Sequence, residues 1–286
     1  MYRGKNIIAV TPAGRKRYIN VLKEYILNNP IIDEWKIWQN TTNPEDIQFL
    51  NHIATTSKKI TIEKRSGDVG NSLNIHKFFD NCIKPNHVYV RFDDDIVWMD
   101  KRSVQNLLDH RIDNPQYFIT YGNIINNAIC DHLHQRIGAL PIQPHIGYSV
   151  YDHHGWNNPS TAEDKHRILL GKIHNQELSD YVFSQWILGV YERVSINVIS
   201  WLGEEFAKFD GKVATDEEEW LSVTKPKQIL TPNAICGTAL FSHFAFFTQR
   251  EHMDKTNILH LYEKMVDRIP KENRSAIKTP TNIVYL

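Results

Sequence analysis

The chain has 286 residues and an ordinary globular composition, with 41% hydrophobic and 23% charged residues. The 33 Lys and Arg residues balance 33 Asp and Glu residues, so there is no overall basic field to attract a nucleic acid backbone. Cys82, Cys130 and Cys236 are odd in number and form no CxxC pair, which predicts reduced thiols in a cytoplasmic protein. No signal peptide or transmembrane segment is expected, so any membrane contact would be peripheral.

The first hundred residues alternate between strand-like and helix-like segments. Short apolar or alternating runs predict strands at 6–10, 34–39, 60–63 and 88–92. Helical patterns predict helices around Ile19 to Ile26, after a cap at Asn43, over 73–82 and over 101–111. Strands separated by helices of this length imply βαβ units and a parallel sheet. The fold class predicted is therefore α/β, with helices flanking a mostly parallel central sheet.

The second part of the chain is less regular. A strand is expected at 117–121, and residues 123–170 then read as an insertion of loops rich in histidine, aromatic residues and proline. After it we expect a helix over 176–190, a strand over 194–201 and a helical tail over about 251–268. No linker or internal repeat interrupts the sequence, so we expect a single domain over 1–286.

Three consecutive aspartates, Asp93, Asp94 and Asp95, follow the apolar run VYVRF. Side chains at the carboxyl ends of strands are where α/β sheets bind ligands. Adjacent carboxylates repel one another, and a hard divalent cation such as Mg²⁺ or Mn²⁺ relieves that repulsion. Held by so few side chains, such an ion usually completes its coordination with phosphate oxygens. The alternative is a solvated turn that caps the next helix, with Asp100 as the N-cap.

With these elements in order, residues 5–250 resemble the GT-A class of nucleotide-sugar glycosyltransferases, most closely its inverting, family 2-like branch. Four segments carry the resemblance, namely VTPAGR, QNTTNPED, the aspartate run and SINVISWLGEEFAKFDGKVATDEEEWL. It implies a Rossmann-like GT-A domain with a nucleotide-binding half over about 1–122 and an acceptor-side half over about 123–286.

The first two segments are similar to the turns that hold the nucleotide. The resemblance implies donor contacts from Thr11, Pro12, Ala13 and Arg15. Gly14 stands where the family usually has asparagine, and Asn40 stands where it often has an acidic residue near the base. The identity of the base is therefore left open.

The aspartate run looks like the DXD motif of this class. By that resemblance Asp93 and Asp94 lie at the nucleotide sugar, and Asp93 and Asp95 hold the Mn²⁺ or Mg²⁺ ion. His243, in the aromatic segment GTALFSHFAFFTQR, is a further candidate ligand, because a histidine after the acidic motif often returns to the metal. Its alternative is a structural histidine in the core. Arg250 is either a phosphate ligand or a surface arginine.

The acidic run DEEEW is similar to the motif that supplies the catalytic base. An inverting transfer needs one carboxylate to take the proton from the acceptor hydroxyl. Glu217 is the first choice, followed by Asp216 and Glu218. The alternative is an acidic first turn stabilised by the helix dipole.

The insertion is interpreted as the acceptor-binding region. Five of its histidines and its three aromatic residues suit hydrogen bonding and stacking on sugar rings. Ordinary loop packing is the alternative, and a zinc site is less favoured because ligand spacing is loose. The residues are His132, His134, His145, Tyr148, Tyr151, His153, His154 and Trp156.

The predicted function is metal-dependent transfer of a sugar from a nucleoside diphosphate sugar to a hydroxyl of a glycan or other acceptor, with inversion. A retaining mechanism is favoured if no acidic side chain reaches the acceptor. The alternatives are a nucleotidyltransferase acting on sugar phosphates and a catalytically silent GT-A-like binding module. The neutral charge balance argues against a nucleic acid acceptor, although Arg15, Lys16 and Arg17 form a local basic patch.

Overall fold

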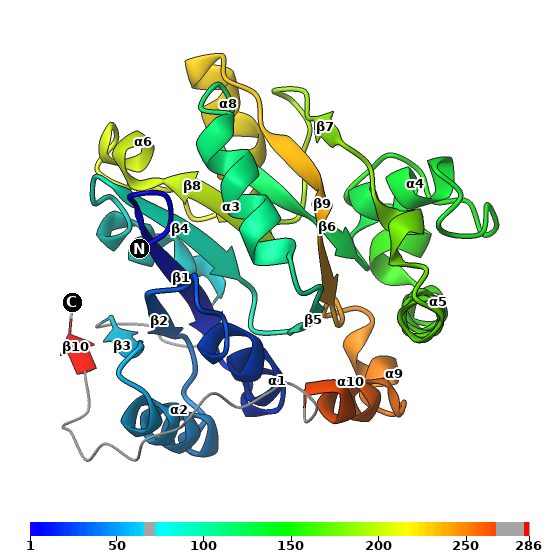
Figure 1. The fold of residues 1–286 in the computed structure, drawn as a ribbon, viewed down its shortest axis with the longest axis horizontal. Helices are drawn as coiled ribbons and strands as arrows, with labels where there is room; N and C mark the ends of the chain where they lie inside the picture. The colour runs from blue at the N-terminus through cyan, green and yellow to red at the C-terminus, as the bar shows by residue number, and fades with distance from the viewer. Residues whose placement is uncertain (66–71, 267–282, 286) are drawn as a thin grey trace.

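The computed structural model describes residues 1–65, 72–266 and 283–285, and a single mixed sheet runs through it (Figure 1). Its strands are β1 (Asn6–Ala13), β2 (Glu34–Gln39), β3 (Ile60–Lys64), β4 (His87–Phe92), β5 (Ile96–Met99), β6 (Thr120–Ile125), β7 (Gln185–Ile187), β8 (Val198–Leu202), β9 (Ala234–His243) and β10 (Ile283–Tyr285). Their spatial order is β10-β3-β2-β1-β4-β8-β6-β9-β5, with β7 beside β9.

The strands at one edge of the sheet, β10, β3, β2, β1 and β4, are all parallel. Strand β8 runs antiparallel between β4 and β6, β9 is parallel to β6, and β5 and β7 are antiparallel to β9. Parallel pairings therefore predominate among the described strands, and the predicted α/β sheet is confirmed.

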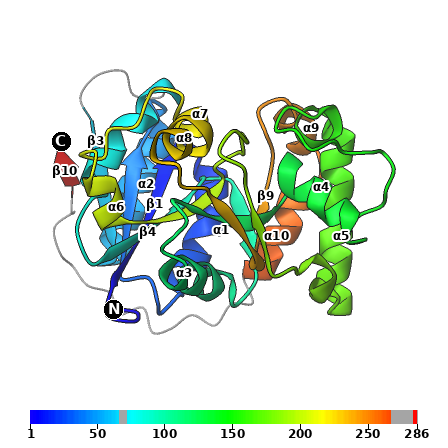
Figure 2. The ribbon, with the colours of Figure 1, turned by 90° about the horizontal axis from the view of Figure 1, so that it is seen from above.

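Helices flank the sheet. They are α1 (Lys16–Leu27), α2 (Pro44–Thr56), α3 (Ser103–Asp113), α4 (Ala128–Arg136), α5 (Pro159–Asn175), α6 (Gly203–Ala207), α7 (Glu217–Glu219), α8 (Lys225–Ile229), α9 (Arg250–Met253) and α10 (Ile258–Val266). Segments of 3₁₀- or π-helix are η1 (Ser72–Asn81), η2 (His153–Asn157), η3 (Leu178–Tyr181) and η4 (Trp220–Thr224). Figure 2 shows α4, α5, α9 and α10 grouped on one side of the molecule, with α2, α6, α7 and α8 on the other.

The structure confirms the predicted start of the helix after Asn43, which is α2. The Asn43 side chain accepts from the backbone N–H of Glu45 at 2.9 Å, and Pro44 occupies the first turn. The predicted cap of α3 is wrong by two residues. The Asp100 side chain accepts from Arg102 N at 3.2 Å, but the helix begins only at Ser103. The four residues after the aspartate run form β5 instead.

The expectation that 123–170 contains only loops is wrong. Helix α4 is capped by Asn127, and α5 by Asn158, whose side chain accepts from Thr161 N at 3.0 Å. The helix expected over 176–190 is also wrong, because Gln176 has a left-handed backbone (φ 61°) that ends α5. Only the turn η3 and strand β7 follow.

The tail forms α9 and α10, and the part of the predicted tail beyond Val266 lies outside the described residues. Among the helices that the structure describes, none combines the length and apolar character that a membrane crossing requires.

Candidate functional site

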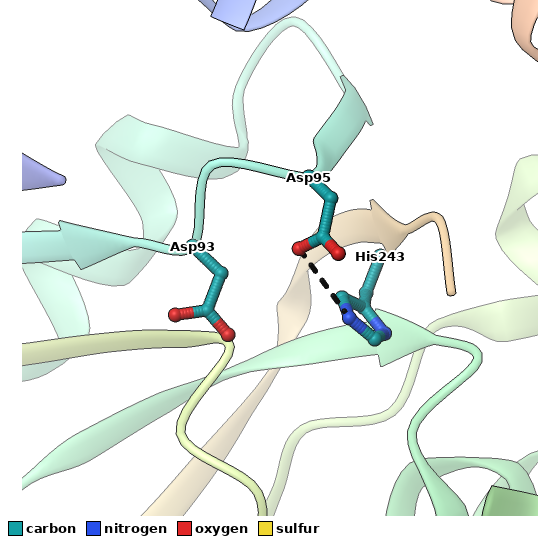
Figure 3. Close-up of side chains that lie close together, drawn as sticks. All are labelled: Asp93, Asp95 and His243. Carbon is teal, nitrogen blue, oxygen red and sulfur yellow. Dashed lines mark ion pairs between the residues drawn. The ribbon is translucent and has the colours of Figure 1, made fainter. Parts of the chain in front are cut away.

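The aspartate run forms the turn between β4 and β5, close to the end of β9 (Figure 3). Asp93 N donates to the carbonyl of Asn197 at 2.8 Å, and the carbonyl of Asp95 accepts from Phe244 N at 2.9 Å. Neighbouring strand ends therefore fix the backbone of the turn from two sides.

Asp93, Asp95 and His243 come together at this turn. One candidate ligand atom from each lies within 4.8 Å of the others, and His243 Nε2 is 3.4 Å from Asp95 Oδ1. His243 Nδ1 lies 3.1 Å from the carbonyl of Asn126, so in the tautomer that donates this bond Nε2 presents its lone pair to the carboxylates. Two carboxylates and an imidazole form a donor set that suits Mn²⁺ and is compatible with Mg²⁺.

A buried network sets the position of the carbonyl that accepts from His243. Asn126 has a left-handed backbone (φ 63°), which costs energy for a residue other than glycine. Its N–H donates to Asp131 Oδ1 at 3.1 Å, and its side-chain amide donates to Gln249 Oε1 at 2.9 Å. Asp131 in turn forms an ion pair of 2.7 Å with Lys165. No pattern in the sequence links these residues to His243.

Asp94 is bound by Gly14 and Arg15, which connect β1 to α1. Arg15 Nε donates to Asp94 Oδ2 at 3.1 Å, a second Arg15 nitrogen contacts Asp94 Oδ1, and Gly14 N donates to Asp94 at 3.0 Å. Arg15 also lies 3.0 Å from Asp95. Burial opposes the charged guanidinium, yet Asp94 and Asp95 raise the pKa of Arg15 above its ordinary value. A permanent positive charge therefore borders the candidate metal-ligand cluster of Asp93, Asp95 and His243.

Asp95 keeps its negative charge despite being buried. Burial alone would raise its pKa, but Arg15, His243 and Arg250 together hold the pKa of Asp95 below its ordinary value. The guanidinium of Arg250 lies 3.9 Å away. Asp93 differs, because burial outweighs the influence of Arg91 and raises its pKa.

The predicted nucleotide contacts lie at the ends of β1 and β2. Thr11, Pro12 and Ala13 are buried, and the Thr11 hydroxyl accepts from Trp35 Nε1 at 3.0 Å. Asn40 N donates to the carbonyl of Ala13 at 2.9 Å. A Cβ at position 14 would lie 3.1 Å from the carbonyl of Asn40, which gives a steric reason for glycine here. Their contact with a nucleotide remains a prediction.

The acidic run is divided between two environments. Glu217 Oε1 lies 2.9 Å from Arg91 Nη1, and Arg91 Nη2 donates to Asp93 Oδ1 at 2.9 Å. The Glu217 side chain is 12% exposed and its Oε2 has no hydrogen-bond partner. Burial raises the pKa of Glu217 to about 7, against the opposing influence of Arg91. A carboxylate with this pKa suits proton transfer near neutral pH.

The other two candidates are held by Arg193. Asp216 accepts from Arg193 at 2.9 Å and 3.0 Å and caps the N–H of Glu219 at 3.0 Å. Glu218 accepts from Arg193 Nε at 2.9 Å. Sequence reasoning missed both Arg91 and Arg193. The signal for Arg91 was an arginine inside the apolar run VYVRF, since a buried charge requires a partner.

The histidines of the insertion do not form a metal site. Within the described part of the chain, Asp93, Asp95 and His243 are the only group of three His, Cys, Asp or Glu side chains close enough to share an ion. His132 bonds the carbonyl of Ile146 at 2.8 Å, and His134 bonds Asn123 at 2.6 Å.

No family model matches the chain, and no curated protein matches it in sequence. Solved structures do match. The mannosyltransferase PcManGT from Pyrobaculum calidifontis, in complex with GDP-Man and Mn²⁺, aligns with a TM-score of 0.53 at 10% identity. The alignment covers 96% of this chain and 67% of that one. The chain has a GT-A-like fold.

A second match is a CMP:2-keto-3-deoxy-manno-octonic acid synthetase in complex with CTP, with a TM-score of 0.47 and 10% identity, covering 91% of this chain and 99% of that one. At this identity the likenesses concern the fold alone. The GT-A resemblance that four short segments suggested is confirmed at that level.

Proposed function

We propose that the chain is a metal-dependent glycosyltransferase that moves a sugar from a nucleoside diphosphate sugar to an acceptor hydroxyl with inversion. One observation carries this proposal. Glu217 is a mostly buried carboxylate whose Oε2 has no hydrogen-bond partner, and Arg91 pairs with both Glu217 and Asp93 of the metal-ligand cluster. This reaction needs a base and a metal site, and here Arg91 connects the two candidates. The GT-A-like neighbour that holds GDP-Man and Mn²⁺ supports the proposal.

Asp93, Asp95 and His243 would hold Mn²⁺ or Mg²⁺, and such an ion neutralises the charge that develops on a departing diphosphate. Arg15 and Arg250 add positive charge on the same side, next to Asp95. Thr11, Pro12, Ala13 and Asn40 are proposed to border the nucleotide. The donor nucleotide and sugar are not specified by these contacts.

Glu217 acts as the general base. Its Oε2 takes the proton of the acceptor hydroxyl. At the same time the hydroxyl oxygen forms a bond to the anomeric carbon of the donor sugar, and the bond from that carbon to the diphosphate breaks. Arg91 holds Oε1, and we assign the acceptor hydroxyl to Oε2, which is buried and has no hydrogen-bond partner. Asp216 and Glu218, the second and third choices, are bound to Arg193 instead, so we assign them to positioning the helix that bears Glu217.

Calorimetric titration of GDP, UDP and CDP with and without Mn²⁺ tests the donor site. We expect one nucleotide to bind in a metal-dependent manner in the wild type. Asp95→Ala should reduce that affinity by at least about a hundredfold, since a lost metal contact removes several kcal/mol. Asp164→Ala is the matched control, because this aspartate lies on the exposed side of α5 and should not affect binding.

The products then identify the reaction. Release of the nucleoside diphosphate from the sugar nucleotide, together with a glycosylated acceptor, supports transfer. Pyrophosphate released from a nucleoside triphosphate and a sugar phosphate would instead identify a nucleotidyltransferase. Nucleotide binding that is unaffected by Asp95→Ala, or no binding with any metal, would refute the proposed metal-dependent donor site.

A further inference from the structure

Three aromatic side chains from two segments of the chain, one around η2 and one after β9, gather near the metal-ligand cluster. We call Tyr151, Trp156 and Phe247 the aromatic platform. Tyr151 is 59% exposed and Phe247 is 69% exposed. Among the described residues, Tyr191 is the only other exposed large aromatic side chain. Exposed apolar side chains that cluster, unlike scattered ones, mark binding sites.

The platform is built to a fixed geometry. The ring centroids of Trp156 and Phe247 are 5.3 Å apart, and those of Tyr151 and Trp156 are 6.0 Å apart. Thr248 Oγ1 donates to the carbonyl of Trp156 at 2.9 Å, which connects the segment after β9 to η2. The Asp152 side chain accepts from the N–H groups of Gly147, His154 and Gly155 at 2.8–2.9 Å. Rings held in place before binding lose little entropy when a ligand arrives.

The platform is continuous with the proposed active site at both ends. At one end the ring of Phe246 lies 6.3 Å from Trp156 and 4.5 Å from the candidate metal ligand His243. At the other end the Arg193 guanidinium lies 5.5 Å from the Tyr151 ring and pairs with Glu218, the residue after Glu217. A ligand on the platform would therefore lie between the metal ligand and the base.

We propose that the aromatic platform binds a sugar ring of a carbohydrate acceptor. Aromatic faces pack against the apolar C–H faces of sugars, and nearby polar side chains bond the hydroxyls. Here His153 and Asn157 are exposed on the same short helix as Trp156, and Asp216 remains 56% exposed beside Arg193. A purely apolar partner would bury these groups without hydrogen bonds, at a cost in free energy. The proposal rests on the proposed function, since a transferase needs its acceptor here.

An array of immobilised neutral and acidic oligosaccharides tests the platform, with GDP and Mn²⁺ present or omitted. The wild type should bind at least one oligosaccharide. The double variant Tyr151→Ala/Phe247→Ala should bind it at least about fivefold more weakly, because it loses two ring contacts. Leu230→Ala is the control, since Leu230 is 81% exposed at the end of α8 and should bind as the wild type does.

Calorimetry of GDP with Mn²⁺ on the same proteins separates this proposal from the proposed function. Unchanged metal–nucleotide binding in the double variant, with weakened oligosaccharide binding, supports both. In a second outcome, the wild type binds oligosaccharide but no metal–nucleotide, and the double variant loses the oligosaccharide binding. That result would refute the proposed transferase function and support the carbohydrate site. Equal oligosaccharide binding by wild type and double variant overturns the platform. The absence of any oligosaccharide binding by the wild type also overturns it. A third contrary outcome is that the wild type binds only phosphatidylcholine vesicles, offered as an apolar alternative, and that the double variant loses this binding.

Discussion

Two groups of buried charged side chains lie close together and are compensated very differently. The interior pair, Asp131 and Lys165, balances one charge with one, and Lys165 Nζ also donates to the carbonyl of Gly155 at 3.2 Å. In the site cluster, two guanidinium groups compensate four carboxylates, and a third guanidinium, that of Arg250, lies 3.9 Å from Asp95. The members of the site cluster are Arg15, Arg91, Asp93, Asp94, Asp95 and Glu217.

This contrast distinguishes a structural charge from a functional one. Burying a charge is costly unless partners compensate it, and the interior pair meets that condition. In the site cluster, Glu217 keeps a buried oxygen without a partner and a raised pKa. Perturbed groups of this kind concentrate at functional sites. The comparison predicts that changes in the site cluster reduce activity, whereas changes in the interior pair reduce stability.

The largest effect is expected from Glu217→Gln. Loss of the base should lower kcat by a factor of about 10²–10⁴, because that is the range that general base catalysis contributes. Metal–nucleotide binding should be retained. In the wild type kcat/KM should rise with pH through about 7 and then level off, since burial raises the pKa of Glu217 to about 7 and only its deprotonated form accepts a proton. The variant should lose this pH dependence.

Glu218→Gln provides the matched control, because Glu218 carries the same group one residue further on and pairs with Arg193 rather than Arg91. It should reduce kcat far less than Glu217→Gln does. A larger loss for Glu218→Gln would transfer the role of base to that residue.

The second effect is on stability. Lys165→Met leaves Asp131 buried without its cation, which should lower the free energy of unfolding by about 3–5 kcal/mol. Urea unfolding followed by circular dichroism measures this loss. Lys172→Met is the control, since Lys172 lies on the same helix and pairs with the half-exposed Asp180 at 2.5 Å. Its loss should stay within about 1 kcal/mol. Equal losses in the two variants would refute the structural role of the interior pair.

The sequence predicted the parts of the molecule that depend on local pattern. The alternation of apolar runs and helical faces placed β1 to β4, and the carboxyl end of a buried strand placed the aspartate run. The loop composition between α4 and α5, rich in proline, histidine and aromatic residues, was extended over the whole insertion, although Asn127 and Asn158 offered caps for the two helices.

The candidate site was predictable only where its residues lie in motifs. Asp93, Asp95 and Glu217 stand in segments that resemble the GT-A class, and His243 was a candidate because a histidine after the acidic motif often returns to the metal in that class. Arg91 could have been suspected as a charge within a strand, but its partner Glu217 lies 126 residues further along the chain. Asn126 supports His243 through a backbone carbonyl, and no side-chain pattern encodes such a contact. Long-range pairing and backbone geometry were therefore beyond the sequence.

The smallest effect sharpens the comparison, because here a site variant should gain stability. Burial raises the pKa of Glu217 from 4.5 to about 7, so the folded chain binds a proton more tightly than the unfolded chain. The stability that this proton contributes is complete below pH 4.5 and is lost as pH rises through 7. Glu217→Gln keeps the neutral form at every pH. Without added metal, its free energy of unfolding should exceed that of the wild type by roughly 3 kcal/mol at pH 8, with little difference at pH 4.5. Urea unfolding at both pH values measures the gain, and a variant less stable than the wild type at pH 8 would show that the Arg91 ion pair outweighs the burial of Glu217.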